Sequence, residues 1–162
     1  MIALLDVNTL VALAWPNHIH HEAAHRWFAE YREQPERGQQ AEQGDQRGQS
    51  WATCPITESG FVRVSSNPAT TPEARSPVEA IELLQRMVAQ PGHVFWSDDI
   101  SLATDELVSR QRLVGYRQVT DVHLLSLAIR RGGRLVTFDR GILQLVPETE
   151  TRAPRDVVEV IG

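Results

Sequence analysis

The sequence predicts an α/β protein with a mostly parallel central sheet. Short apolar runs typical of buried strands alternate along the chain with segments of helical periodicity. Two of these runs, IALLD and RLVTFD, end on an aspartate. Strands that alternate with helices form βαβ units, which place helices on both faces of a parallel sheet. Ligands of such sheets bind at the carboxyl ends of the strands, so we expect both aspartates at a binding edge.

The composition is that of one folded domain, residues 1–162, which is long enough to bury an apolar core. Hydrophobic residues make up 41% of the chain and charged residues 23%. No apolar run approaches the roughly 18 residues that cross a membrane. Asp6 interrupts the apolar N-terminus, which is therefore unlike a signal peptide. Cys54 is the single cysteine, so we expect no internal disulfide and a cytoplasmic protein.

In the first half of the chain we expect two strands and three helices. The strands are short and apolar, and the helices carry apolar residues at helical spacing. Asn8 is expected to cap the first helix and Pro16 to end it, since Asn is a frequent cap and Pro interrupts helices. In order, these elements are the strand 2–5, the helices 9–15 and 18–33, the strand 51–54 and the helix 56–66.

The second half continues the alternation of helices and strands. Pro77 suits the first turn of a helix. Thr120 is expected to cap a strongly apolar helix that Gly132 and Gly133 close. In order, the expected elements are the helix 77–90, a strand in PGHVFW, a helix ending near Arg112, the helix 121–131, a strand in RLVTFD, a helical turn around Ile142 and a strand in DVVEVIG.

Residues 34–50 interrupt this pattern. The segment QPERGQQAEQGDQRGQS is rich in Gln, Gly and charged residues and almost free of apolar ones. Such a composition buries too little apolar surface to pack. We therefore expect a flexible surface insertion within the single domain.

Two further acids occupy the first turns of expected helices. Asp121 and Glu58 each have apolar residues three and four positions later, so their carboxylates share the core-facing stripe. The helix dipole stabilises an acid at this place by about 0.3–1 kcal/mol, which does not explain the orientation. A buried carboxylate without a partner costs several kcal/mol. A neighbouring cation is therefore expected.

The four acids Asp6, Glu58, Asp121 and Asp139 would repel one another if the fold brings them together. An arginine could neutralise them, but hard oxygen ligands suit Mg²⁺ or Mn²⁺ better. Such ions activate water and clamp a phosphodiester for in-line attack. The set therefore fits metal-assisted phosphodiester hydrolysis, with each acid a candidate metal ligand or general base.

The sequence resembles a known family, the PIN-domain ribonucleases, and specifically the VapC-type toxins of bacterial toxin–antitoxin pairs. The stretches LLDVNTLVAL, TESGFVRV, TDVHLLSLA and LVTFDRG carry the resemblance, in the order of the family and over nearly the whole chain. The segment 34–50 is longer than the usual link at that place. The resemblance implies a PIN-like three-layer α/β/α domain that cleaves RNA with Mg²⁺ or Mn²⁺.

The resemblance also implies residue roles and partners. The acidic tetrad of the family falls on Asp6, Glu58, Asp121 and Asp139, and Asn8 matches the small polar residue after the first acid. A homodimer is implied, together with a VapB-type antitoxin that wraps the toxin and reaches its acidic pocket.

Basic residues bear on substrate binding and on the alternatives. All 16 are arginines, although the net charge is −5. Arg63 and Arg140 lie close in sequence to the acids, where each could contact an RNA phosphate or remain a surface residue. A haloacid-dehalogenase-like phosphatase and a phosphoacceptor receiver domain normally need a lysine, which this chain lacks. The phosphatase motif would also need an acid in place of Asn8.

A catalytically inactive PIN-like binding module is a further alternative. Loss of one of the four acids would favour it, and all four are present. The stretch HIHHEAAH suggests zinc, but its histidines lack a further ligand at a familiar spacing, so we expect an ordinary helix start there.

Overall fold

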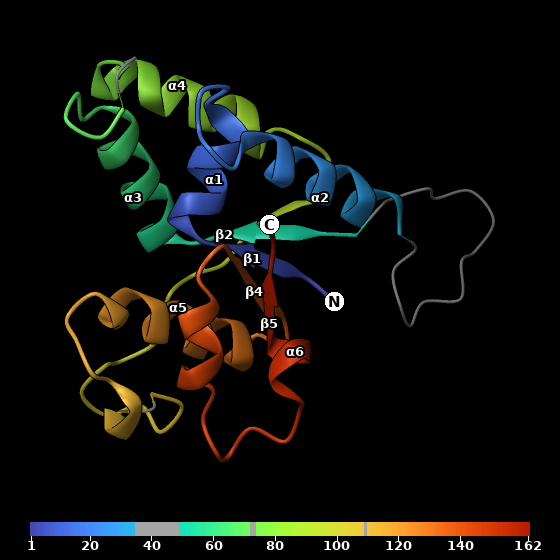
Figure 1. Ribbon diagram of the computed structural model, residues 1–162, viewed down its shortest axis with the longest axis vertical. Helices are drawn as coiled ribbons and strands as arrows, with labels where there is room; N and C mark the ends of the chain where they lie inside the picture. Colours follow the sequence, from blue (N-terminus) through green and yellow to red (C-terminus); the bar gives the residue numbers. More distant parts are fainter. Residues whose placement is uncertain (35–48, 72–73, 109) are drawn as a thin grey trace.

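The computed structural model of the protein describes residues 1–34, 49–71, 74–108 and 110–162 (Figure 1). Within these ranges, five strands form one sheet in which every neighbouring pair is parallel. The strands are β1 (Ala3–Leu5), β2 (Trp51–Thr53), β3 (His93–Phe95), β4 (Arg134–Thr137) and β5 (Val158–Val160). The five expected strands are thus confirmed.

The strand order is β3-β2-β1-β4-β5. From β1 the chain first builds outward through β2 and β3, and it then returns to the other side of β1 to add β4 and β5. The direction of winding therefore reverses between β1 and β4. This reversal opens a crevice at the carboxyl ends of two adjacent strands.

Helices cover both faces of the sheet (Figure 1). The helices α1 to α4 lie on one face, and α5 and α6 lie on the other with the short 3₁₀ turns. Their bounds are α1 (Val7–Ala14), α2 (His21–Glu33), α3 (Pro55–Ser65), α4 (Pro77–Val88), η1 (Arg110–Arg112), α5 (Gln118–Arg130), η2 (Arg140–Leu145) and α6 (Pro154–Val157).

The core consists of two apolar clusters that the sheet separates. Ala3 and Leu5 belong to the cluster beneath α1 to α4, whereas Leu4 belongs to the cluster beneath α5 and α6. Successive strand residues point to opposite faces, so β1 must be apolar throughout to serve both clusters. Burial on both faces fixes β1 at the centre of the sheet.

The expected cap of the first helix was wrong. Asp6, not Asn8, is the N-cap of α1, and its Oδ1 accepts a hydrogen bond from the Thr9 backbone N–H at 2.6 Å. Asn8 consequently lies inside the helix with its side chain exposed. The helix starts as soon as β1 ends, which leaves room for a single connecting residue.

The expected cap of the apolar helix was also wrong. The helix α5 begins at Gln118, so Thr120 lies within its first turn. The Gln118 side-chain carbonyl accepts hydrogen bonds from the backbone N–H groups of Val114 and Gly115. This closed turn starts the helix earlier than the sequence pattern suggests.

A helix ending near Arg112 was expected, and the described residues show only the 3₁₀ turn η1 there. Asp98 accepts a hydrogen bond from the Ile100 N–H, and Asp105 accepts one from the Leu107 N–H. These local turns compete with helix formation for the backbone groups. Aspartates two residues before apolar positions therefore produce loops in this stretch.

Of the expected insertion, Gln34, Gln49 and Ser50 are described, and 35–48 lie outside the described residues. The Gln49 side chain donates to the Gln34 side chain at 3.1 Å, and Arg32 donates to the Gln49 carbonyl at 2.7 Å. The described chain thus leaves α2 and re-enters before β2 at neighbouring points. In the described ranges, every helix is too short or too polar to span a bilayer.

Candidate active site

The candidate site lies where the winding of the sheet reverses. Asp6 directly follows β1, and Asp139 lies two residues beyond the last residue of β4. The strands pair with Leu5 opposite Val136, and the Asp6 N–H donates to the Val136 carbonyl at 3.1 Å. Both aspartates therefore sit at the carboxyl edge of the sheet, beside the crevice that this topology creates.

Asp6 is fixed and buried, with 7% of its surface exposed. Besides capping α1, its carboxylate interacts with the side chains of Thr9 and Thr137. Burial raises the pKa of Asp6, the hydrogen bonds with the two threonines lower it, and the charge of Asp139 raises it further. Removal from water is the largest of these effects, and it disfavours the charged form relative to that of an exposed aspartate.

Asp121 lies in the first turn of α5 and is half-buried. Burial raises its pKa to about 6, and the negative charges of Asp139 and Asp6 contribute to the rise. Three elements distant in sequence thus bring three carboxylates within electrostatic reach of one another. None of the ion pairs among the described residues involves these three aspartates.

Asp139 is the exposed member of the group. Its Oδ1 accepts a hydrogen bond from the Gly141 N–H at 2.7 Å, and its own N–H donates to Thr137 Oγ1 at 3.0 Å. A Cβ on residue 141 would lie 3.0 Å from the same carboxylate oxygen. Glycine at this position therefore leaves space for the carboxylate beside the start of η2.

Glu58 occupies a different environment from the aspartates. It lies in the first turn of α3, where Pro55 begins the helix and Thr57 Oγ1 accepts from the Cys54 N–H. Its Oε1 accepts a hydrogen bond from Thr53 Oγ1 at 2.6 Å. Burial lowers the pKa of His93 below its ordinary value, and the nearby charge of Glu58 offsets part of this shift. Glu58 therefore faces the β2–β3 side of the carboxyl edge.

The acidic set fits a hard divalent cation in its chemistry. Carboxylate oxygens are the ligands that Mg²⁺ and Mn²⁺ prefer, and a cation would relieve the repulsion that raises the pKa of Asp121. As they stand, the described residues contain no group of three or more His, Cys, Asp or Glu side chains close enough to hold an ion. Metal binding therefore requires the carboxylates to approach one another.

The other predicted residues lie on the surface. Asn8 is the second residue of α1, Arg63 lies near the end of α3, Thr120 precedes Asp121, and Arg140 follows Asp139 at the start of η2. All four side chains are exposed, and none makes an ion pair or side-chain hydrogen bond within the described ranges. The two arginines are thus free to meet a ligand.

The sequence pattern did not indicate the three threonines that support the acids. Thr9, Thr53 and Thr137 are each fully buried, and their hydroxyl or backbone groups contact Asp6, Glu58 or Asp139. Thr53 and Thr137 end strands, where threonine is ordinarily a good strand former. The available signal was their proximity in sequence to the acids, in DVNT, TCPITE and TFD.

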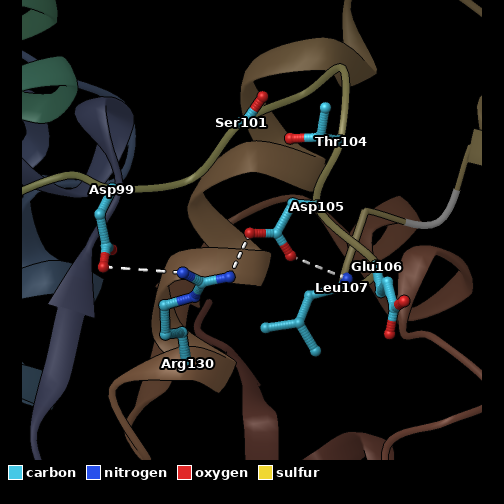
Figure 2. Close-up of a pocket in the computed structure, with 7 residues that line it drawn as sticks. All are labelled: Asp99, Ser101, Thr104, Asp105, Glu106, Leu107 and Arg130. Carbon is cyan, nitrogen blue, oxygen red and sulfur yellow. Dashed lines mark hydrogen bonds and ion pairs between the residues drawn. The ribbon is translucent and has the colours of Figure 1, made fainter.

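A cluster of charged side chains around Arg130 is separate from this site. A cavity of about 520 Å³ is lined by Asp99, Asp105 and Arg130 among others, at the end of α5 remote from Asp121 (Figure 2). Arg130 lies 3.6 Å from Asp99 and also contacts Asp105, so its charge is already paired.

The histidines near α2 act as a helix cap. His21 Nδ1 donates to the Ala12 carbonyl at 2.8 Å, and His25 Nε2 donates to the Leu13 carbonyl at 2.9 Å. These carbonyls belong to the last turn of α1, where a helix has no further backbone N–H groups to donate to them. The expected helix start at His18 was wrong by three residues, because the chain forms turns up to His20 and α2 begins at His21.

Comparison with known proteins identifies the class. Residues 3–146 match the family model described as the PIN domain. The chain belongs to the PIN-domain family, and the expected three-layer fold is thereby confirmed. The fold also resembles a solved structure titled "Crystal structure of VapBC2 from Rickettsia felis bound to a DNA fragment from their promoter". The TM-score is 0.61 at 14% identity, and both chains are covered completely.

Within this family, the chain is similar in sequence to proteins named VapC ribonucleases. It is 47% identical over 160 residues to Ribonuclease VapC38 of Mycobacterium tuberculosis, covering 99% of this chain and 98% of that protein. It is 45% identical over 142 residues to Ribonuclease VapC39 of the same species, covering 88% and 91%. The predicted resemblance to VapC-type PIN toxins is confirmed.

Proposed function

We propose that the protein is a Mg²⁺- or Mn²⁺-dependent endoribonuclease that acts as the toxin of a VapBC toxin–antitoxin pair. The observation that carries this proposal is the convergence of Asp6, Asp121 and Asp139 at the winding reversal of a PIN fold. Burial together with their repulsion raises the pKa of Asp121 to about 6, and no ion pair in the described residues relieves that repulsion. The chain's membership of the PIN-domain family and its similarity to proteins named as ribonucleases support the same function.

The residues that would hold the metal are Asp6, Asp121 and Asp139, with Glu58 joining from α3. A bound Mg²⁺ or Mn²⁺ supplies a water of lowered pKa and neutralises charge on the phosphodiester. The Thr9 N–H holds the Asp6 carboxylate in place, and the Gly141 N–H does the same for Asp139. Arg63 and Arg140 would contact the RNA phosphates and offset the net charge of −5.

The test is cleavage of RNA by the purified protein with Mn²⁺ or Mg²⁺, next to an EDTA control and an Asp6→Asn variant. We expect both controls to abolish cleavage. Asp156→Asn is the matched control variant, because Asp156 is exposed in α6, two residues before β5 at the amino edge of the sheet. Cleavage that survives Asp6→Asn would contradict the proposal. An inactive PIN-like module would bind RNA without cutting it in either metal.

We also infer a VapB-type antitoxin, a homodimer and a cytoplasmic location. The VapBC2 title of the similar structure supports the antitoxin, and a buried, free Cys54 suits a reducing compartment. Co-expression with a VapB-type antitoxin partner should yield a stable complex, and light scattering of the purified toxin should give twice the chain mass. A monomer at all concentrations would contradict the dimer.

A further inference from the structure

Thr53 is fully buried at the carboxyl end of β2 and lies between two ionisable side chains. Its Oγ1 is 2.6 Å from Glu58 Oε1 and 2.8 Å from His93 Nε2. The sheet register produces this arrangement. Trp51 is the direct partner of His93 across β2 and β3, and Thr53 is two residues further along β2 on the same face. Diagonal neighbours of this kind are within reach of a long side chain such as histidine.

The single hydroxyl proton of Thr53 determines which groups donate in the hydrogen bonds that link His93, Thr53 and Glu58. A threonine hydroxyl carries one hydrogen, and an ionised carboxylate only accepts. Thr53 must therefore donate to Glu58, and His93 Nε2 must donate to Thr53 Oγ1. The Trp51 ring packs edge-on against the imidazole, with centroids 4.7 Å apart, and restricts its orientation.

We propose that Thr53 and His93 are positioning residues that hold the Glu58 carboxylate in place at the carboxyl edge of the sheet through the chain His93 → Thr53 → Glu58. This inference rests on the proposed metal-dependent function and assigns two residues to it that the acidic motif does not contain. Within the described residues, only Oε1 of Glu58 accepts a side-chain hydrogen bond, which leaves Oε2 available as a ligand. A half-buried glutamate without this hydrogen bond would sample several rotamers.

The experiment measures Mn²⁺ affinity by calorimetry on the full chain, for wild type, Thr53→Val and Thr53→Ser. Loss of a partner that orients a metal ligand typically costs 10–100-fold in affinity. We expect Thr53→Val to weaken Mn²⁺ binding about 10-fold and Thr53→Ser to restore it. Thr71→Val is the matched control, because Thr71 is also buried and donates to the Val64 carbonyl at 3.0 Å. It should leave Mn²⁺ affinity unchanged.

The imidazole is tested in two ways. His93→Leu should weaken Mn²⁺ binding, and His93→Gln, whose amide can donate from a similar place, should recover part of it. ¹⁵N NMR of the metal-free wild type should show the His93 proton on Nε2. A proton on Nδ1 alone would overturn the direction of the chain, and this spectrum does not depend on how well any variant folds.

Glu58→Gln separates the failure of this inference from the failure of the proposed function. If wild type binds no Mn²⁺, the metal site itself is wrong and the positioning role falls with it. If Glu58→Gln weakens binding but Thr53→Val binds as wild type or more tightly, only the positioning role is overturned. Adding Thr53→Val to Glu58→Gln should weaken binding no further, because both changes remove the same contribution.

Discussion

Asp139 raises the pKa of Asp121 more than Asp6 does, although burial has the largest effect on that pKa. Asp121 begins α5 and Asp139 follows β4, so the pair joins a helix and a strand across the carboxyl edge of the sheet. The repulsion between these two carboxylates is an unfavourable interaction in the metal-free fold.

Asp121→Asn should make the metal-free protein more stable at pH 7.5. The folded-state pKa of about 6 exceeds the ordinary value of 3.8, so the stabilising contribution of protonated Asp121 is present below about pH 4. It is lost as the pH rises through about 6. We expect the variant to gain on the order of 1–2 kcal/mol at pH 7.5, after allowance for solvent screening, and nothing near pH 4. Urea unfolding at both pH values with EDTA measures this difference, and equal stabilities at pH 7.5 would contradict it.

Asp6 should have separable roles in folding and in chemistry. Asp6→Asn keeps a side-chain oxygen that can cap α1, so its free energy of unfolding should equal or exceed that of wild type while cleavage is lost. Asp6→Ala also removes the cap and should cost about 1 kcal/mol relative to Asp6→Asn. Paired urea-unfolding and RNA-cleavage measurements test both statements. A large loss of stability in Asp6→Asn would show that the carboxylate charge itself supports the fold.

Arg140→Ala should weaken RNA binding in a salt-dependent manner. The side chain is exposed directly after Asp139, where it would meet a phosphate of the substrate. Loss of one phosphate contact should reduce the slope of log affinity against log salt by about 0.7 for single-stranded RNA. Arg155→Ala is the control, because Arg155 is exposed in α6, which precedes β5 at the opposite edge of the sheet. Titration of a catalytically inactive background at several salt concentrations measures the slopes.

His123→Ala should destabilise the protein without removing its activity. His123 is 8% exposed, and its Nε2 lies 2.8 Å from Asp98 Oδ2. The variant removes the imidazole from a largely buried carboxylate and leaves only the Ile100 N–H as its partner within the described residues, which costs on the order of 2–3 kcal/mol. Cleavage per folded molecule should remain, since the ring points away from the acids toward the loop after β3. Equal stability of the variant and wild type would show that Asp98 finds water instead.

The strands and the acids at their ends were predictable because both signals are local. Four apolar residues followed by Asp6 indicate a buried strand that ends at a binding edge, and this required no knowledge of contacts. The cap of α1 was misassigned because Asp6 serves as cap and as candidate ligand together. The sequence pattern does not distinguish an aspartate that has both roles from one that has only one of them.

The environment of Glu58 depends on long-range register and was not predictable. The sequence shows Glu58 five residues after Thr53, which suggests at most a local contact. The role of His93 arises only when β3 pairs beside β2 with Trp51 as its neighbour. Among the described residues before Arg112 no α-helix forms, for a different reason: the side chains of Asp98 and Asp105 bind the backbone there in local turns.

The hydrogen bond between Gln34 and Gln49 makes the segment between them a convenient place to engineer the protein. Gln49 precedes β2, so this junction lies at the amino edge of the sheet, opposite the acids. Added loop length costs little, since each doubling costs only about 0.6 kcal/mol in closure entropy. A fluorescent reporter or an affinity handle grafted there should leave the chemistry intact, and the same junction should accept a short turn in a minimised version of the toxin.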